Sequence, residues 1–209
     1  MTYFHIFKEH FLSKKPFVQC KLRDQGDAGT VLKGSPACLT SGMVRKPSFY
    51  AYQHISAIKG DLLFWSKYHS VVKTACGGSP VYILTAFNYN DEMERLCPRD
   101  VGVHETDDII NSFVDELSLD FSLPLPEGEY TVIKFSLTNE NSFFHYMAQL
   151  GFPKTDPLLD HMQHLLCTHP YNHVHVAQSD GTLNIDLALQ GAGVQIAVIQ
   201  AAQTERRNK

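Results

Sequence analysis

The sequence lacks an excess of either charge. It has 18 Lys and Arg against 22 Asp and Glu, a formal net charge of −4. A nucleic-acid-binding surface needs a basic face that neutralises phosphates, so the composition gives no support for direct nucleic-acid binding. Charged residues make up 19% of the chain and hydrophobic residues 44%. This balance is typical of a chain with a packed core and not of a disordered one.

The sequence also lacks long apolar runs and paired cysteines. No stretch approaches the roughly 20 apolar residues that a helix needs to cross a bilayer. The first residues show neither the basic start nor the apolar centre of a signal peptide, so we expect a cytoplasmic protein without membrane contact. The scattered cysteines form no CxxC pair, which predicts reduced thiols and argues against a zinc site built on thiolates. There are five of them: Cys20, Cys38, Cys76, Cys97 and Cys167.

Helical patterns occur in four segments. Residues 3–13, 47–60, 141–150 and 156–167 have the apolar spacing or the end signals of helices. Pro47 stands at the first helical position, where a missing N–H is harmless, and Gly60 follows the last turn as a C-cap. Between the first two helices, residues 17–22 predict a short buried strand.

From residue 61 onward the pattern is that of strands. Strand-like segments include residues 62–74, 81–89, 117–123, 130–137 and 194–199, with a Gly77-Gly78 turn after the first. Residues 173–189 predict a hairpin around Ser179-Asp180-Gly181, and residues 90–112 predict a long loop. The fold class is therefore mainly β with some α. We expect a β-sandwich with two inserted helices over residues 61–203 and a polar tail over residues 204–209.

Several short pieces occur in a characteristic order along the chain: Lys21–Asp24, Gly34–Pro36, Leu39–Gly42, Lys46–Ala51, Gly60-Asp61, Gly128–Val132, Asn139, Asn141–Phe143, Met147–Gly151 and Asp180–Asn184. Taken in order, these pieces resemble the C-terminal part of glycoside hydrolase family 39, the β-xylosidase family. The resemblance implies that residues 1–60 are the last helix, strand and helix of a (β/α)8 barrel. It also implies that they pack on the β-sandwich, which is the accessory domain.

The same resemblance bears on catalysis. Retaining glycosidases use two carboxylates about 5–5.5 Å apart, which in this family follow the fourth and seventh barrel strands and would therefore lie before Met1. We expect no catalytic residue here: the resemblance is to a glycoside hydrolase, but this chain alone is expected to be inactive. Asn139-Glu140 looks like a general-acid pair, but it ends a sandwich strand, so Glu140 is predicted to be a turn residue or helix cap. Four other glutamates are predicted to be solvated in loops or turns: Glu92, Glu94, Glu127 and Glu129.

The substrate-binding residues of the family are only partly matched. Relatives carry an aromatic sugar platform, commonly tryptophan, where this chain has Cys20, and a thiol cannot stack on a pyranose ring. Asp24 is a candidate substrate-binding residue. It is equally suited to cap its own loop, and we favour capping.

The chain has eleven histidines, and some are close enough in sequence to suggest zinc. His161 and His164 share a predicted helix face, and His169, His173 and His175 follow. No fourth ligand is evident, so we predict neither a metal nor a cofactor and expect His173 and His175 to point from one face of a strand. Three aromatic residues are predicted to belong to the core: Trp65, Tyr82 and Phe87.

Three functions remain open. The first is a non-catalytic accessory region of a β-xylosidase-like hydrolase, whose partner would be the rest of the barrel and whose ligand a β-xyloside or oligosaccharide. The second is a carbohydrate-binding or sugar-sensing module, since some relatives are joined to helix-turn-helix regulators of the arabinose type. The third is a dimerising interaction domain, because an exposed barrel face would need a second copy of the chain to cover it. That face comprises Phe4, Phe7, Phe11, Phe17 and Phe49.

Overall fold

A computed structural model describes residues 38–39, 43–96, 102–151 and 170–202. The predicted helices over residues 3–13 and 156–167 and the predicted strand over residues 17–22 lie outside these ranges. Within them, no helix has the length and apolar character needed to cross a membrane.

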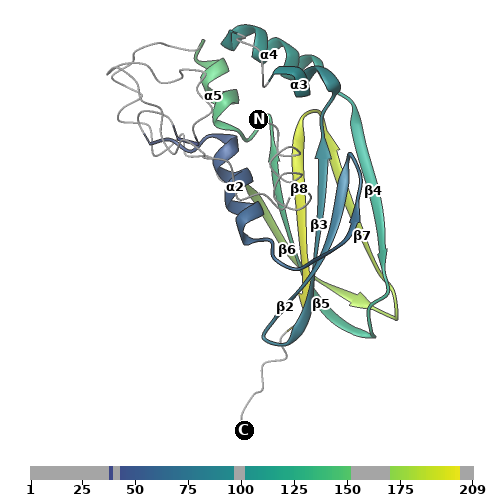
Figure 1. Cartoon of the computed structure of the whole chain (residues 1–209). Coiled ribbons are helices and arrows are strands. Elements are labelled where there is room, and N and C mark those ends of the chain that lie inside the picture. The colour runs from purple at the N-terminus through teal and green to yellow at the C-terminus, as the bar shows by residue number, and fades with distance from the viewer. Residues whose placement is uncertain (1–37, 40–42, 97–101, 152–169, 203–209) are drawn as a thin grey trace.

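Six strands form one antiparallel sheet in the order β1-β2-β3-β8-β5-β6 (Figure 1). The chain therefore places its last strand, β8, between β3 and β5. Because β8 has a neighbour on each side and a packed layer over each face, its apolar residues run almost without interruption. The strands are β1 (Asp61–Trp65), β2 (His69–Cys76), β3 (Ser79–Asn88), β5 (Gly128–Thr138), β6 (Tyr171–Ser179) and β8 (Gly193–Ala201).

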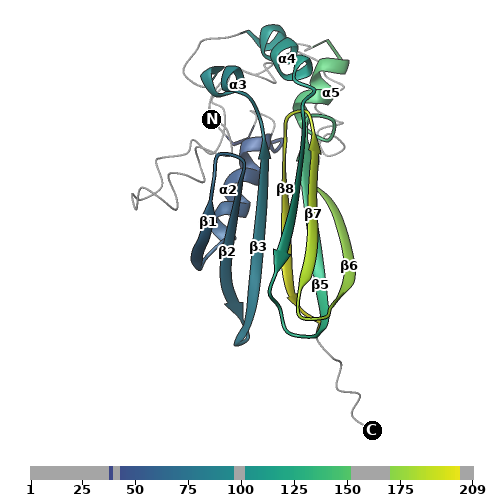
Figure 2. The ribbon, with the colours of Figure 1, turned by 90° about the vertical axis from the view of Figure 1, so that its right-hand side faces the viewer.

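Two further strands, β4 (Glu116–Leu123) and β7 (Leu183–Gln190), form a second antiparallel sheet that we call the ribbon. Their residues alternate between buried and exposed, as expected of strands that pack on one side only. Figure 2 shows the ribbon lying over β8 and β5, while β1 stays uncovered on this side. The predicted β-sandwich is thus present, with a wide sheet and a narrow one.

Helix α2 (Pro47–Ala57) covers the other face of the large sheet, so the molecule has three layers (Figure 1). Tyr50, Ala51, Ile55 and Ile58 pack there with Val72, Ile83, Phe87 and Ile196. A second core lies between the large sheet and the ribbon, formed by residues such as Leu84, Val132, Ile185, Leu187 and Ile199. Strand residues of the large sheet therefore alternate between two cores.

Both helices predicted within the described ranges are confirmed. Pro47 begins α2, and its C-cap is Ile58, two residues before Gly60. Helix α5 (Phe143–Gln149) begins after Ser142, whose hydroxyl accepts the backbone N–H of His145, and ends before Gly151, whose φ is +72°.

The predicted long loop over residues 90–112 is wrong. It contains α3 (Asp91–Leu96) and α4 (Val103–Ser112). The side chain of Asn90 accepts the backbone N–H of Met93 at 2.9 Å, which caps the first turn of α3. Met93 and Phe113 are buried against the end of the sheet, and Ile109 and Ile110 pack against the same core. The segment is mostly polar, but it contains a few apolar residues whose burial stabilises the helices.

The predicted hairpin over residues 173–189 is also wrong. β6 pairs with β5, and β7 pairs with β4, so the chain passes from one sheet to the other at the turn. Ser179 fixes this crossing because its buried hydroxyl donates to the carbonyl of Leu125 at 2.9 Å and accepts the N–H of Gly181 at 3.3 Å. The turn residues were identified correctly, but the strands on each side of the turn are not partners.

Gly60 is required where β1 begins. Its φ is +137°, and a Cβ there would lie 2.2 Å from the backbone oxygen of Lys73. We expect Gly60→Ala to lower the free energy of unfolding by about 2 kcal/mol or more. Gly128→Ala is the matched control, because Gly128 has φ +147° and no atom within 4 Å of a Cβ. Equal losses in urea denaturation of the two variants would contradict the close approach at Gly60.

Stability is expected to fall in acid because of His54, which lies on α2 with its ring centroid 5.7 Å from that of Phe135. Burial lowers the pKa of His54 from its ordinary value of 6.5. The unfolded chain then binds protons more readily, so the free energy of unfolding decreases as the pH falls below about 6.5. His69 and His175 also have lowered pKa values, so the wild type should show a combined decrease. Denaturation between pH 7.5 and 5.5 should give a shallower decrease for His54→Leu, and an unchanged slope would contradict this assignment.

Candidate functional site

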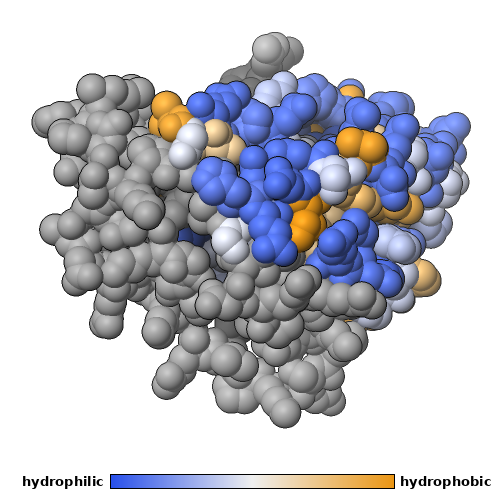
Figure 3. Space-filling model, turned by 90° about the horizontal axis from the view of Figure 1, so that it is seen from above, coloured by the Kyte–Doolittle hydropathy of each residue, from blue (hydrophilic) through white to orange (hydrophobic). Residues whose placement is uncertain are grey.

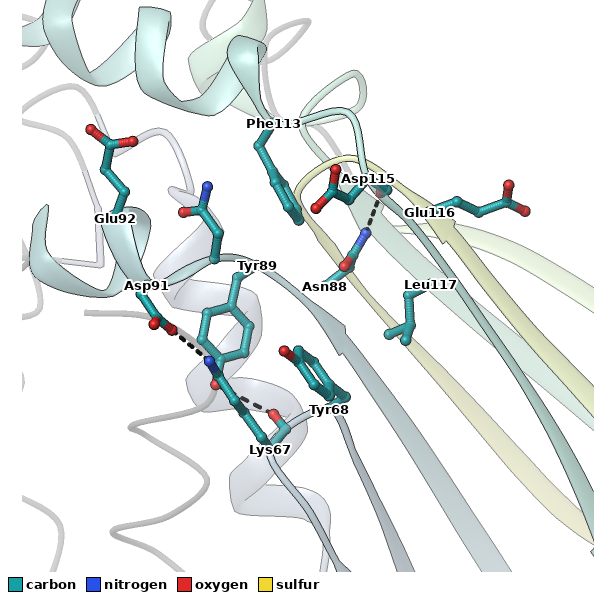
Figure 4. Close-up of a pocket in the computed structure, with 11 residues that line it drawn as sticks. Lys67, Tyr68, Asn88, Tyr89, Asp91, Glu92, Phe113, Asp115, Glu116 and Leu117 are labelled. Carbon is teal, nitrogen blue, oxygen red and sulfur yellow. Dashed lines mark hydrogen bonds and ion pairs between the residues drawn. The ribbon is translucent and has the colours of Figure 1, made fainter.

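A hollow of about 540 Å³ opens at the end of the sandwich where α3 and α4 sit (Figure 4); we call it the upper hollow. It is formed by the β1–β2 connection, the end of β3 with the start of α3, and the α4–β4 connection. Seen from above, the described surface at this end is mainly hydrophilic with small apolar patches (Figure 3). The lining residues are Lys67, Tyr68, Asn88, Tyr89, Asn90, Asp91, Glu92, Phe113, Asp115, Glu116 and Leu117.

One wall of the upper hollow is organised around the ammonium of Lys67. It forms an ion pair with Asp91 Oδ1 at 2.5 Å and lies 5.5 Å from the ring centroid of Tyr68 and 5.7 Å from that of Tyr89. The hydroxyl of Tyr89 donates to the carbonyl of Lys67 at 3.3 Å. Both the ion pair and the cation–π contacts fix the two tyrosines relative to the start of α3. The pair is solvent-exposed, so it contributes to orientation more than to stability.

The floor of the upper hollow is held by Asn88, which is 6% exposed. Its amide donates to the carbonyl of Asp115 at 2.8 Å (Figure 4) and to that of Gly191 at 2.9 Å. The N–H of Gly191 also donates to the carbonyl of Asp115 at 3.0 Å. Asn88 therefore joins the end of β3 to the start of the ribbon and to the β7–β8 turn.

The charge of the upper hollow favours neutral or cationic ligands. Four carboxylates line it, from Asp91, Glu92, Asp115 and Glu116, against the single ammonium of Lys67. Carboxylates and amides accept hydrogen bonds from hydroxyl groups, and the tyrosine rings give an apolar wall. Asp91 is already ion-paired with the ammonium of Lys67. The arrangement is suited to binding a polyhydroxylated molecule.

The glutamates considered from the sequence occupy different places. Glu140 is exposed in the turn between β5 and α5, as predicted, and Ser142 is the cap of that helix. Glu92 is exposed at the upper hollow instead of lying in a loop. Glu127 and Glu129 are exposed beside their turn. The side chain of Glu94 lies outside the described part of the chain, as do Asp24 and Cys20.

The side chains of His173, His175 and the three predicted core aromatic residues lie where the sequence predicts. His173 and His175 project from one face of β6 with ring centroids 5.1 Å apart, and no group of three metal-ligating side chains occurs among the described residues. Phe87 is buried, and Trp65 packs on it at 6.1 Å, while Tyr82 packs half-buried against the second core. Histidines 161, 164 and 169 lie outside the described ranges.

The surface predicted to be covered by a second copy is described only at Phe49. Its side chain is half-buried and lies under the guanidinium of Arg45, with 4.9 Å between the guanidinium carbon and the ring centroid. The other four phenylalanines of that surface lie outside the described residues. Of the cysteines, Cys38 is buried and Cys76 is exposed; the remaining three are not in the described ranges.

Sequence reasoning did not identify the upper hollow. Its residues come from segments of chain that were predicted as separate strands and a loop, and only the fold brings them together. The available signal was the run Asn88-Tyr89-Asn90-Asp91, where polar and aromatic residues follow a buried strand directly. Such positions at strand ends are where binding residues often lie.

The sequence matches no protein-family model and no curated protein. The structure is nevertheless similar to that of the GH39 enzyme from Xanthomonas axonopodis pv. citri, with a TM-score of 0.67 and 15% identity over 96% of this chain and 40% of that chain. It is also similar to a monomeric beta-xylosidase from Caulobacter crescentus CB15, with a TM-score of 0.65 and 16% identity over 97% of this chain and 42% of that chain.

These likenesses confirm the predicted fold. The described strands have the arrangement of the C-terminal β-sandwich region of family 39 glycoside hydrolases. The chain spans about two fifths of the length of the enzymes it matches. At 15–16% identity the likeness is one of fold.

Asn88→Ala is expected to lower the free energy of unfolding by about 2 kcal/mol, because it removes the buried amide that donates to the carbonyls of Asp115 and Gly191. For a domain of this size, the melting temperature should fall by roughly 4–8 °C. Asn172→Ala, at an exposed position of β6, is the control and should have little effect. Equal thermal unfolding of the wild type and Asn88→Ala would contradict the role given to Asn88.

Proposed function

We propose that this chain is a non-catalytic accessory region of a β-xylosidase-like glycoside hydrolase. The observation that supports this best is the coverage of the structural likeness: nearly the whole chain matches, but it matches only about two fifths of each enzyme. In this proposal residues 1–60 are the end of a (β/α)8 barrel, residues 61–203 are its sandwich, and residues 204–209 are a polar tail.

The proposal assigns the chemistry to a part of the hydrolase that this chain does not contain. A retaining glycosidase needs a proton donor and a nucleophile about 5–5.5 Å apart, and barrel enzymes carry such groups at the C-terminal ends of barrel strands. The carboxylates of the upper hollow come instead from sandwich connections and from α3, and Asp91 is engaged by Lys67. These contacts favour a supporting role over a catalytic one.

The accessory role itself would depend on α2. In this proposal α2 is the last barrel helix, and it buries Tyr50, Ala51 and Ile55 against the large sheet. A barrel element that shares a hydrophobic core with the sandwich would couple the two physically, because separating them would expose that core to water. The sandwich would then stabilise the end of the barrel.

A carbohydrate-binding module is the second candidate, and the upper hollow favours it. Tyr68 offers an exposed ring beside carboxylate and amide groups that can accept hydrogen bonds from sugar hydroxyls. Such a module could serve a hydrolase or a sugar-sensing regulator, and both would tolerate the absence of catalytic glutamates.

Incubation of the purified chain with p-nitrophenyl β-xyloside separates these roles from catalysis. We expect no release of nitrophenol above the buffer rate, from a preparation whose circular dichroism shows a β-rich fold. Glu92→Gln and Glu140→Gln serve as matched variants. They alter the glutamate that lines the upper hollow and the glutamate of the Asn139-Glu140 pair, which looks like a general-acid pair. Turnover by the wild type that either single substitution abolishes would overturn the proposal.

A further inference from the structure

An aromatic side chain stands exposed on the uncovered face of β1. Phe64 is 48% exposed, although one face of its ring is stacked on His69, with centroids 4.8 Å apart and planes inclined by 15°. Because His69 covers that face, solvent meets the opposite face and the edge of the ring. A flat apolar surface of one ring is thus presented outward.

A β-bulge is responsible for this placement. Leu62 pairs with Val72, but Phe64 pairs with the next residue, Val71, so Leu63 is an extra residue in β1. Strict alternation would put Phe64 on the same face as Leu62, inside the core beneath α2. The bulge moves it to the opposite face, and Trp65 then packs with Leu62 against that core. Bulges re-aim side chains in this way and are frequent beside functional sites.

The ring of His69 is held firmly behind Phe64. Its edge meets Phe121 of the ribbon, with centroids 5.5 Å apart and planes inclined by 78°. The hydroxyl of Ser66 lies 3.0 Å from His69 Nδ1, accepts the N–H groups of Tyr68 and His69, and donates to the carbonyl of His69 at 3.3 Å. Burial lowers the pKa of His69, so the neutral ring supports Phe64 at neutral pH. A support that is already ordered reduces the entropy cost of binding.

Polar groups of balanced charge stand next to this ring. Asp61 of β1 pairs directly with Lys73 of β2, and both project from the same face as Phe64 and Val71. Diagonal neighbours on a sheet face are about 7–8 Å apart, which is within reach of a ligand lying on Phe64. Lys73 Nζ also lies 5.8 Å from the ring centroid of Tyr82. One carboxylate and one ammonium favour a neutral ligand with hydroxyl groups over an anion or a cation.

We propose that Phe64, supported by His69, is a platform that binds one ring of a neutral, xylose-based oligosaccharide, with Asp61 and Lys73 bonding its hydroxyl groups. The C–H groups on the flat face of a pyranose meet the negative face of an aromatic ring favourably. β1 is the edge strand of the large sheet, and the ribbon leaves it uncovered (Figure 2), so an extended oligosaccharide can cross it. A nucleobase would also stack, but the net charge of −4 opposes a polyanion.

The test is titration of the full chain with xylohexaose, in which binding is measured by calorimetry and by saturation-transfer NMR. We expect saturable binding, with saturation transferred from aromatic protons to the sugar-ring protons, and about tenfold weaker binding by Phe64→Ala. Phe64→Trp should retain or strengthen binding, because an indole offers a larger face. Leu63→Ala is the matched control, since Leu63 is 54% exposed on the same strand, and it should bind as the wild type does.

Three outcomes would overturn the platform. They are absence of xylohexaose binding by the wild type, equal binding by a correctly folded Phe64→Ala variant, and a dimer in sedimentation that Phe64→Ala dissociates without any sugar binding. Circular dichroism and thermal unfolding of each variant establish that it is folded. The choice of a xylose-based ligand rests on the proposed function, but the two can fail separately, because xyloside turnover would refute the non-catalytic role while leaving these binding measurements unchanged.

Discussion

The hydrogen bonds of Asn88 are the contact on which the upper end of the molecule depends. One buried amide joins the end of β3 to the carbonyl groups of Asp115 and Gly191, which are distant in sequence. These bonds fix where β4 begins relative to the large sheet and where β7 turns into β8. The upper hollow lies above this junction, so its shape follows from the same amide. A buried amide such as that of Asn88 is stable only when its N–H groups are hydrogen-bonded, which is why a small polar side chain can set the arrangement of two sheets.

A second constraint acts at the opposite edge of the large sheet. Gly60 allows the chain to pass close to the backbone of Lys73, and the bulge at Leu63 follows within three residues. Together they allow β1 to direct side chains to both faces of the large sheet. Leu62 and Trp65 pack against the core beneath α2, and Phe64 is exposed on the opposite face. A regular strand would bury Phe64 and expose Trp65. The exposure of one aromatic ring is therefore built into the backbone and is not a defect of packing.

The sequence predicted those elements whose signals are local. The alternation of Leu183, Ile185, Leu187 and Leu189 identifies β7, and Pro47 identifies the start of α2. The sequence did not predict features that depend on which other segment a strand pairs with or a helix packs against. The turn near Gly181 has the residues of a hairpin, but the sequence does not state that its two strands belong to different sheets. Helices α3 and α4 were missed because a few apolar residues in a polar segment become helical through burial against the sheet.

The same distinction explains why neither candidate binding surface was found from the sequence. The upper hollow combines segments that only the fold brings together. Phe64 is exposed instead of buried because of a β-bulge, and no residue pattern in the sequence predicts that bulge. Both surfaces carry rings beside hydrogen-bonding groups, and each has one pair of opposite charges, Lys67 with Asp91 in the upper hollow and Asp61 with Lys73 on the large sheet. Carboxylates accept hydrogen bonds from hydroxyl groups, ammonium groups donate them, and aromatic rings offer an apolar face. Both surfaces therefore have groups suited to binding a molecule that carries hydroxyl groups.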